Sequence, residues 1–108
     1  MRVLLDECLP AGLCRALVGH DATTAPKMGW AGLKNGALLT NAASAGFDVF
    51  LTVDKNLPKQ QNLSAYRIAV VVLRCGSNDI SDLMVLVPEL LEKLPGSLVG
   101  QACFVGGE

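Results

Sequence analysis

Three carboxylates stand at points in this sequence where short apolar segments end. Asp6 and Glu7 directly follow segment 2–5, and Asp54 directly follows segment 47–53. Carboxylates that gather at one point repel each other, so such a cluster persists most easily around a bound cation. Hard divalent ions such as Mg²⁺ and Mn²⁺ prefer these oxygen ligands. If the two segments are neighbouring strands, the sequence predicts a metal site formed by Asp6, Glu7 and Asp54.

The same acids also have ordinary structural roles. An acid just after a strand often caps the helix that follows, and Asp54 could begin a tight turn. For any single acid these roles are the commoner explanation. Two strand ends that converge on one point are harder to explain in this way, because functional sites of open parallel sheets lie beyond the carboxyl ends of the strands.

The elements that must position these acids follow from the alternation of apolar and helical patterns. Strands are expected over residues 2–5, 20–25, 47–53, 67–73 and 98–105, and helices after Pro10, over 34–44 and over 80–94. The strands are apolar on both faces, which is typical of a parallel sheet covered by helices on both sides. We therefore predict one domain over residues 1–108, an α/β/α three-layer sandwich around a mostly parallel sheet of four to five strands.

Composition narrows the class of protein. The chain has 108 residues, of which 51% are hydrophobic and 18% charged. These values exclude a disordered chain and leave room for one core. No apolar run approaches the roughly 20 residues of a membrane span, and the first apolar run is broken at once by Asp6, unlike a signal peptide. We expect a cytoplasmic protein with no membrane partner.

The four cysteines agree with a reducing compartment. They form no C-x-x-C pair, and the even six-residue spacing of Cys8, Cys14 and His20 matches no common zinc motif. We interpret them as small, buried, reduced side chains.

The formal net charge of −1 hides an uneven distribution. Segment 26–75 holds six basic and two acidic side chains, whereas segment 76–108 holds one basic and five acidic ones. A basic middle around an acidic centre fits a phosphate backbone held near Mg²⁺. Ordinary solvated surface charge is the alternative for each individual lysine.

Four linked motifs make the chain resemble a known family. They are LLDECLP at 4–10, GWAGLKNG at 29–36, DVFLTVDKNLP at 48–58 and QQNL at 60–63. In combination they resemble the small PIN-like domain family, a compact branch of the PIN nuclease superfamily that includes many toxins of toxin–antitoxin pairs. The resemblance covers nearly the whole chain. It implies an α/β/α fold and an acidic cluster that binds Mg²⁺ or Mn²⁺ and cleaves RNA phosphodiesters.

The resemblance also implies roles for individual residues. Asp6 and Asp54 fall on the family's metal-binding acids, and Glu7 is a plausible helper in catalysis. The expected partners are an RNA substrate, an antitoxin protein and a second copy of the chain in a homodimer.

Position at the strand ends adds four further candidates. Asn56 and Asp79 could complete the ring of ligands directly or through water, and Lys55 and Arg74 could hold phosphate oxygens.

One position departs from the family pattern and opens an alternative. Related sequences typically read Asn-Gly-Glu-Leu-Leu where this chain reads Asn35-Gly36-Ala37-Leu38-Leu39. The expected carboxylate is missing, and Asn35, which could contact the substrate or a metal-bound water, offers only a neutral oxygen. The second hypothesis is therefore a catalytically weak or silent PIN-like module that binds a protein partner.

A receiver-like phosphoacceptor domain is a third hypothesis, with Asp54 as the acceptor. Receivers require a Ser or Thr after strand four and a Lys after strand five. This chain has Arg74-Cys75 at the first place and no lysine beyond Lys93, so we rank the receiver below the nuclease.

Overall fold

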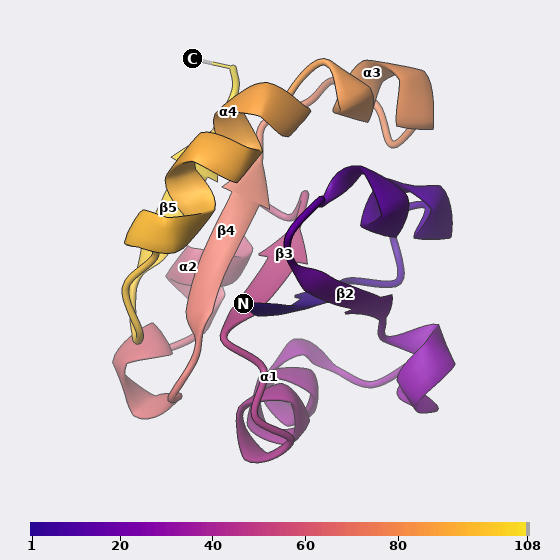
Figure 1. The fold of residues 1–108 in the computed structure, drawn as a ribbon. Coiled ribbons are helices and arrows are strands. Elements are labelled where there is room, and N and C mark those ends of the chain that lie inside the picture. Colours follow the sequence, from indigo (N-terminus) through magenta and orange to yellow (C-terminus); the bar gives the residue numbers. More distant parts are fainter. Residues whose placement is uncertain (108) are drawn as a thin grey trace.

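Five parallel strands form a single sheet in the computed structural model, which describes residues 1–107 (Figure 1). The strands are β1 (Arg2–Leu5), β2 (Asp21–Thr24), β3 (Val49–Thr52), β4 (Ala69–Leu73) and β5 (Ala102–Val105). Their order across the sheet is β2-β1-β3-β4-β5. All four pairings are parallel, so the carboxyl ends of all five strands lie at one edge. This confirms the predicted α/β class.

The strand order reverses between β1 and β3. From β1 the chain goes to β2 on one side, and it then returns to place β3 on the other side of β1. Leu5 pairs with Leu51 in this central contact, so both strands end at the same level. In doubly wound sheets such a switch point opens a crevice beyond the carboxyl ends of the strands, where ligands bind.

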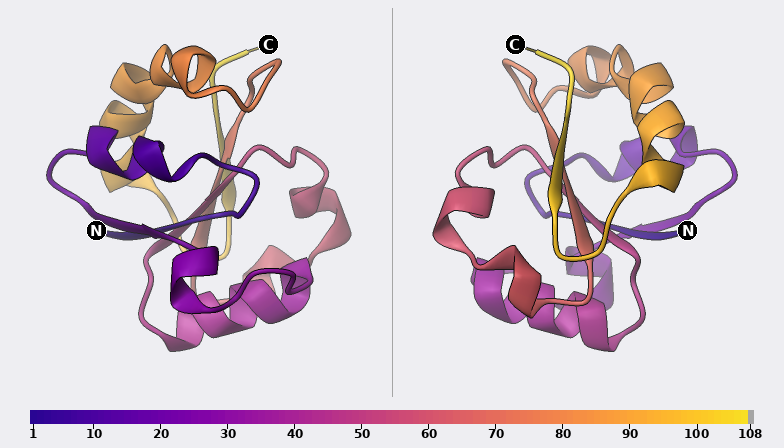
Figure 2. Two further views of the ribbon diagram at one scale, coloured as in Figure 1. Left: turned by 90° about the vertical axis from the view of Figure 1, so that its right-hand side faces the viewer. Right: turned by 90° about the vertical axis from the view of Figure 1, so that its left-hand side faces the viewer.

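Helices lie on both faces of the sheet (Figure 2). On one face, η1 (Ala11–Ala16), α3 (Ile80–Met84), α4 (Val87–Lys93) and η4 (Leu94–Gly96) supply buried leucines to one core cluster. On the other face, α1 (Asn35–Ser44), α2 (Leu57–Gln60) and η3 (Leu63–Ala65) contribute to a second cluster, with η2 (Pro26–Met28) at its border. Each fully buried leucine contributes about 2 kcal/mol.

The strand interiors explain why the chain folds in this way. All five residues of β4 are buried, because helices cover it above and below and strands flank it on both sides. Side chains of a strand alternate between faces, and Val71 accordingly belongs to one cluster while Val70 and Val72 belong to the other. The predicted two-sided burial is confirmed for the central strands β1, β3 and β4, whereas the edge strands β2 and β5 are only partly buried.

Two helix predictions were wrong in detail. The helix expected over 80–94 is two helices, α3 and α4, with Val85 and Leu86 between them. Pro88 lies in the first turn of α4, where its missing N–H removes a bond that a continuous helix would need. The segment after Pro10 is a 3₁₀ helix, and Gly12 within it disfavours α-helical structure.

Several strands and loops also differ in length from the prediction. β5 covers only the second half of segment 98–105, because Gly100 has a φ of 79° that no extended strand adopts. The polar segment after Asp54, which was not predicted to hold regular structure, contains α2 and η3.

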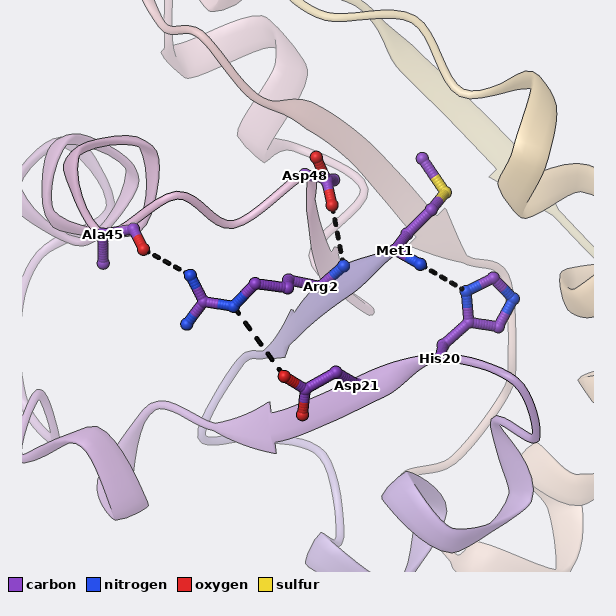
Figure 3. A network of polar contacts seen from close by, with 6 residues as sticks. All are labelled: Met1, Arg2, His20, Asp21, Ala45 and Asp48. Atoms are coloured by element: carbon purple, nitrogen blue, oxygen red, sulfur yellow. Dashed lines mark hydrogen bonds and ion pairs between the residues drawn. The ribbon is translucent and has the colours of Figure 1, made fainter.

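Arg2 organises the amino edge of the sheet, opposite the carboxyl ends of the strands (Figure 3). Its backbone N–H donates to Asp48 Oδ2 at 2.7 Å, its guanidinium donates to the Ala45 carbonyl, and its Nε lies 3.9 Å from Asp21 Oδ2. The guanidinium also covers the Phe47 ring at 4.4 Å. One side chain thus joins β1, β2 and the turn before β3.

Among the described residues, no helix has the length and apolar character needed to cross a membrane.

Candidate functional site

Asp6 and Asp54 follow the two strands that meet at the switch point, and Thr52 joins them. Asp6 is 9% exposed, and its N–H extends the sheet by donating to the Leu51 carbonyl at 2.9 Å. The Thr52 hydroxyl, which is fully buried, donates to Asp6 Oδ2 at 2.8 Å. The same hydroxyl oxygen accepts the N–H of Asp54 at 3.1 Å. The expected meeting of the first and third strands is therefore present, with a threonine as the link.

Asp54 also has the turn role considered as its alternative. Its Oδ1 accepts the backbone N–H of Asn56 at 3.0 Å, which is an Asx turn, and its carbonyl accepts the N–H of Leu57 at 3.2 Å. The half-buried side chain leaves Oδ2 without a hydrogen-bond partner among residues 1–107. The turn holds the carboxylate in a fixed direction, and it does not prevent the second oxygen from binding a ligand.

Glu7 lies on the surface and faces a different group. Its Oε1 accepts the N–H of Gly32 at 2.9 Å, which ties the end of β1 to the loop before α1. Within residues 1–107 no three His, Cys, Asp or Glu side chains are placed to hold one metal ion. The three-carboxylate site predicted from Asp6, Glu7 and Asp54 thus has two members close to Thr52 and a third engaged with a loop.

Asn35 and Asp79 lie at helix starts. Asn35 is the first residue of α1, and Asp79 precedes α3, where its N–H donates to Ser77 Oγ at 3.1 Å. In the described part of the chain neither forms a hydrogen bond to Asp6 or Asp54. No hydrogen bond to either aspartate supports the part in the site that was predicted for them.

The predicted phosphate-binding residues gather in a pocket beside the acid pair. Lys55, Asn56 and Arg74 line a cavity of about 660 Å³ beyond the ends of β3, β4 and β5. Its other lining residues are Val53, Lys59, Leu73, Cys75, Gly76, Phe104 and Gly107. The residues on either side of Asp54, Val53 and Lys55, belong to this lining, so the pocket lies next to the chain segment that carries Asp54.

Cys8 lies close to Asp6 and Thr52, a position that the sequence did not indicate. Partial burial and the nearby charge of Asp6 raise the pKa of its thiol, which also lies close to Thr52. At neutral pH Cys8 is therefore a neutral thiol rather than a thiolate nucleophile.

Sequence reasoning also missed Thr52, Lys59 and Phe104. Thr52 is the single hydroxyl in an apolar strand, two positions before Asp54, which is a signal that could have been read. Lys59 follows Lys55 by four residues, a spacing that places side chains on one side of a helix. Nothing in the sequence brings Phe104, from the last strand, to either lysine.

The donor set of the acid pair fits a hard divalent cation that keeps much of its water. Mg²⁺ commonly binds through one or two carboxylates together with waters and substrate phosphates. Asp6 and Asp54 supply two such carboxylates at one strand edge. Such a cation would also need water or substrate oxygens, because no three His, Cys, Asp or Glu side chains lie together as ligands among residues 1–107.

No protein-family model, no curated protein and no solved structure matches this chain.

Proposed function

We propose that this chain is a PIN-like domain, an α/β/α three-layer sandwich that cleaves RNA phosphodiesters with the help of Mg²⁺ or Mn²⁺. The observation that supports the proposal best is the link Asp6–Thr52–Asp54 at the switch point of the sheet. Doubly wound sheets bind their ligands at this switch point, beyond the carboxyl ends of the strands, and both aspartates follow strands that end there.

In this proposal Asp6 and Asp54 hold the cation, and Thr52 keeps both in place. A bound divalent cation supplies an activated water and neutralises charge on the phosphate oxygens. Lys55 and Arg74 attract the phosphate backbone to the edge where the acids lie. Glu7 positions the loop before α1 through Gly32, and it remains a candidate helper.

The test is RNA cleavage in Mn²⁺ by purified protein and by Asp6→Asn and Asp54→Asn. Asp21→Asn is the matched control, because Asp21 is an exposed aspartate at the amino end of β2. We expect cleavage by the parent protein and the control, and loss in both site variants. Cleavage that persists in both site variants belongs to a contaminant and defeats the proposal.

A catalytically silent module is the second candidate. Ala37 is exposed on α1 where the family pattern has glutamate, and Thr52 links Asp6 only to the backbone N–H of Asp54. Because Ala37 is exposed, Ala37→Glu should fold normally. On this second reading the variant gains Mn²⁺ binding, measured by calorimetry, that the parent lacks. Equal Mn²⁺ binding by Ala37→Glu and by the parent protein would show that Ala37 does not explain a lack of catalytic activity.

A receiver-like domain shares the observed strand order, because 2-1-3-4-5 is the flavodoxin-like order. The groups that follow the strands argue against it: Arg74 follows β4, and Gly106 follows β5. Incubation with acetyl phosphate should leave the mass of the protein unchanged. A phosphoryl adduct on Asp54 would instead favour the receiver.

The biological role included in this proposal is the toxin of a toxin–antitoxin pair, with an antitoxin protein as partner and a homodimer as the assembly. Sedimentation equilibrium tests the dimer directly. A mass of one chain at all concentrations would remove it from the proposal.

A further inference from the structure

The cavity beyond β3, β4 and β5 collects cationic side chains from two separate parts of the chain. Lys55 and Lys59 come from the turn after β3 and from α2. Arg74 follows β4, and its N–H donates to the Val105 carbonyl of β5 at 2.8 Å, which fixes its position in the edge of the sheet. Among residues 1–107 no carboxylate lines the cavity. The cavity is therefore a concave site of one charge sign.

These cations are not held by ion pairs within the described residues. The two ion pairs found in residues 1–107 are Arg2–Asp21 and Glu89–Lys93. Lys93, which lies near Arg74, is occupied by Glu89 at 3.0 Å and by the Phe104 carbonyl at 3.1 Å. Lys55, Lys59 and Arg74 thus remain exposed at the cavity without a carboxylate partner in that part of the chain.

The lining also offers a stacked pair and aliphatic surface. The Arg74 guanidinium lies 4.3 Å from the centre of the Phe104 ring, and Val53 and Leu73 add aliphatic surface. Gly107, with a φ of 62°, passes beside Arg74 where a Cβ would come within 2.6 Å of the Arg74 Cβ. The glycine thus leaves room for the stacked arginine. Aromatic rings and guanidinium planes are the surfaces on which nucleobases stack.

The volume of the cavity distinguishes between the possible classes of ligand. A cavity of about 660 Å³ lies within the range of sites for small organic molecules, and it is much larger than an inorganic anion needs. We propose that this cavity binds a nucleoside monophosphate unit, with its phosphate at Lys55 and Lys59 and its base against the Arg74–Phe104 pair. The unit is either a free nucleotide or one nucleotide of a strand, since both present the same phosphate, sugar and base.

This binding site goes beyond the proposed cleavage activity, because it needs neither a metal ion nor Asp6 and Asp54. If cleavage fails and nucleotide binding is found, the pocket stands without the nuclease. If cleavage is found and the pocket variants bind and cleave like the parent, the nuclease stands without the pocket. Measurements in EDTA keep the two proposals apart.

The test is a titration of the whole chain with AMP in EDTA, followed by calorimetry and by amide shifts in two-dimensional NMR. Adenosine, ribose 5-phosphate and inorganic phosphate are titrated in parallel. We expect saturable AMP binding at least tenfold tighter than that of adenosine or phosphate, with shifts around Lys55, Arg74 and Phe104. A 5′-phosphorylated tetranucleotide that binds more tightly than AMP identifies a strand as the source, and one that binds no more tightly identifies a free nucleotide.

Three variants locate the site. Lys59→Gln removes one phosphate contact and should weaken AMP binding about tenfold, because hydrogen bonds to charged groups are the strong ones. Phe104→Leu should weaken AMP binding but leave that of inorganic phosphate unchanged. Lys27→Gln is the matched control, since Lys27 is an exposed lysine of η2 outside this cavity. It should bind AMP within twofold of the parent.

Three results would overturn the proposal. One is the absence of saturable AMP binding by protein whose NMR spectrum shows it folded. Another is equal affinity for AMP and inorganic phosphate, which would make the cavity a simple anion site. The last is equal weakening by Lys59→Gln and Lys27→Gln, which would reduce the effect to net charge. Unfolding midpoints of the variants are measured beside the titrations, and Lys59→Gln decides the case if Phe104→Leu does not fold.

Discussion

Removing the Thr52 hydroxyl should destabilise the protein and release the acid pair. Thr52→Val keeps the shape of the buried side chain and deletes two hydrogen bonds, one to Asp6 Oδ2 at 2.8 Å and one from the Asp54 N–H at 3.1 Å. The first bond has a charged acceptor that is only 9% exposed, and such bonds contribute about 1.5–3 kcal/mol. The second is a neutral bond of about 0.5–1.5 kcal/mol.

The added methyl group offsets part of this loss, by about 1 kcal/mol for the apolar surface that it buries. The net cost expected for Thr52→Val is therefore about 2 kcal/mol in the free energy of unfolding. For a domain of this size that corresponds to a fall of about 8 °C in the unfolding midpoint. Urea unfolding at pH 7 measures the free energy directly.

A double-mutant cycle with Asp6→Asn separates the charged bond from simple packing. In the Asp6→Asn background the acceptor is neutral, so Thr52→Val should cost about 1 kcal/mol less than it does in the parent. A cost below about 0.5 kcal/mol in the parent, or the same cost in both backgrounds, would refute the reasoning. Either result would mean that Thr52 does not hold the Asp6 carboxylate.

Three further predictions concern other parts of the molecule. Arg2→Met keeps an apolar stem but loses the guanidinium contacts of the amino edge, and urea unfolding should show a loss of about 1–2 kcal/mol. A hydrogen bond from Lys93 and one from a backbone N–H lower the pKa of Glu89. The stability that these two bonds give to the folded protein is therefore present at neutral pH, and it is lost as the pH falls through the lowered pKa of Glu89. NMR titration should show the Glu89 pKa returning toward its ordinary value in Lys93→Met. Burial and the Asp6 charge raise the pKa of Cys8, so Asp6→Asn should speed alkylation of Cys8 at pH 8, measured by mass spectrometry of the peptide.

The sheet was largely predictable from the sequence because its signal is local and strong. Runs such as the one ending at Leu73 are apolar at every position, which only a strand buried on both faces requires. The ends of the elements were less predictable, because they depend on single residues. Pro88 divides the last long helical pattern in two, and Gly100 delays the last strand.

The candidate site was predictable only in part, for the same physical reason. The sequence indicated which residues follow strands, and the neighbouring positions of β1 and β3 bring Asp6 and Asp54 to one edge. It could not indicate where an exposed side chain turns once it is there. Glu7 follows the same strand as Asp6 but bonds to Gly32, because adjacent residues point in different directions at the end of a strand.

One short segment serves both proposed activities. At the end of β3, Thr52 joins the Asp54 backbone N–H to the Asp6 carboxylate, and the next residue, Lys55, lines the cationic cavity. If the acids bind a cation and the cavity binds a phosphate, as proposed, their opposite charges favour a single phosphorylated ligand that spans both. A net charge near zero is then no argument against a nucleic-acid substrate, because the charges that matter are separated within a few residues of one turn. In the two proposals the cavity would attract and orient the ligand and the acid pair would carry the chemistry, so variants of one should leave the other in place.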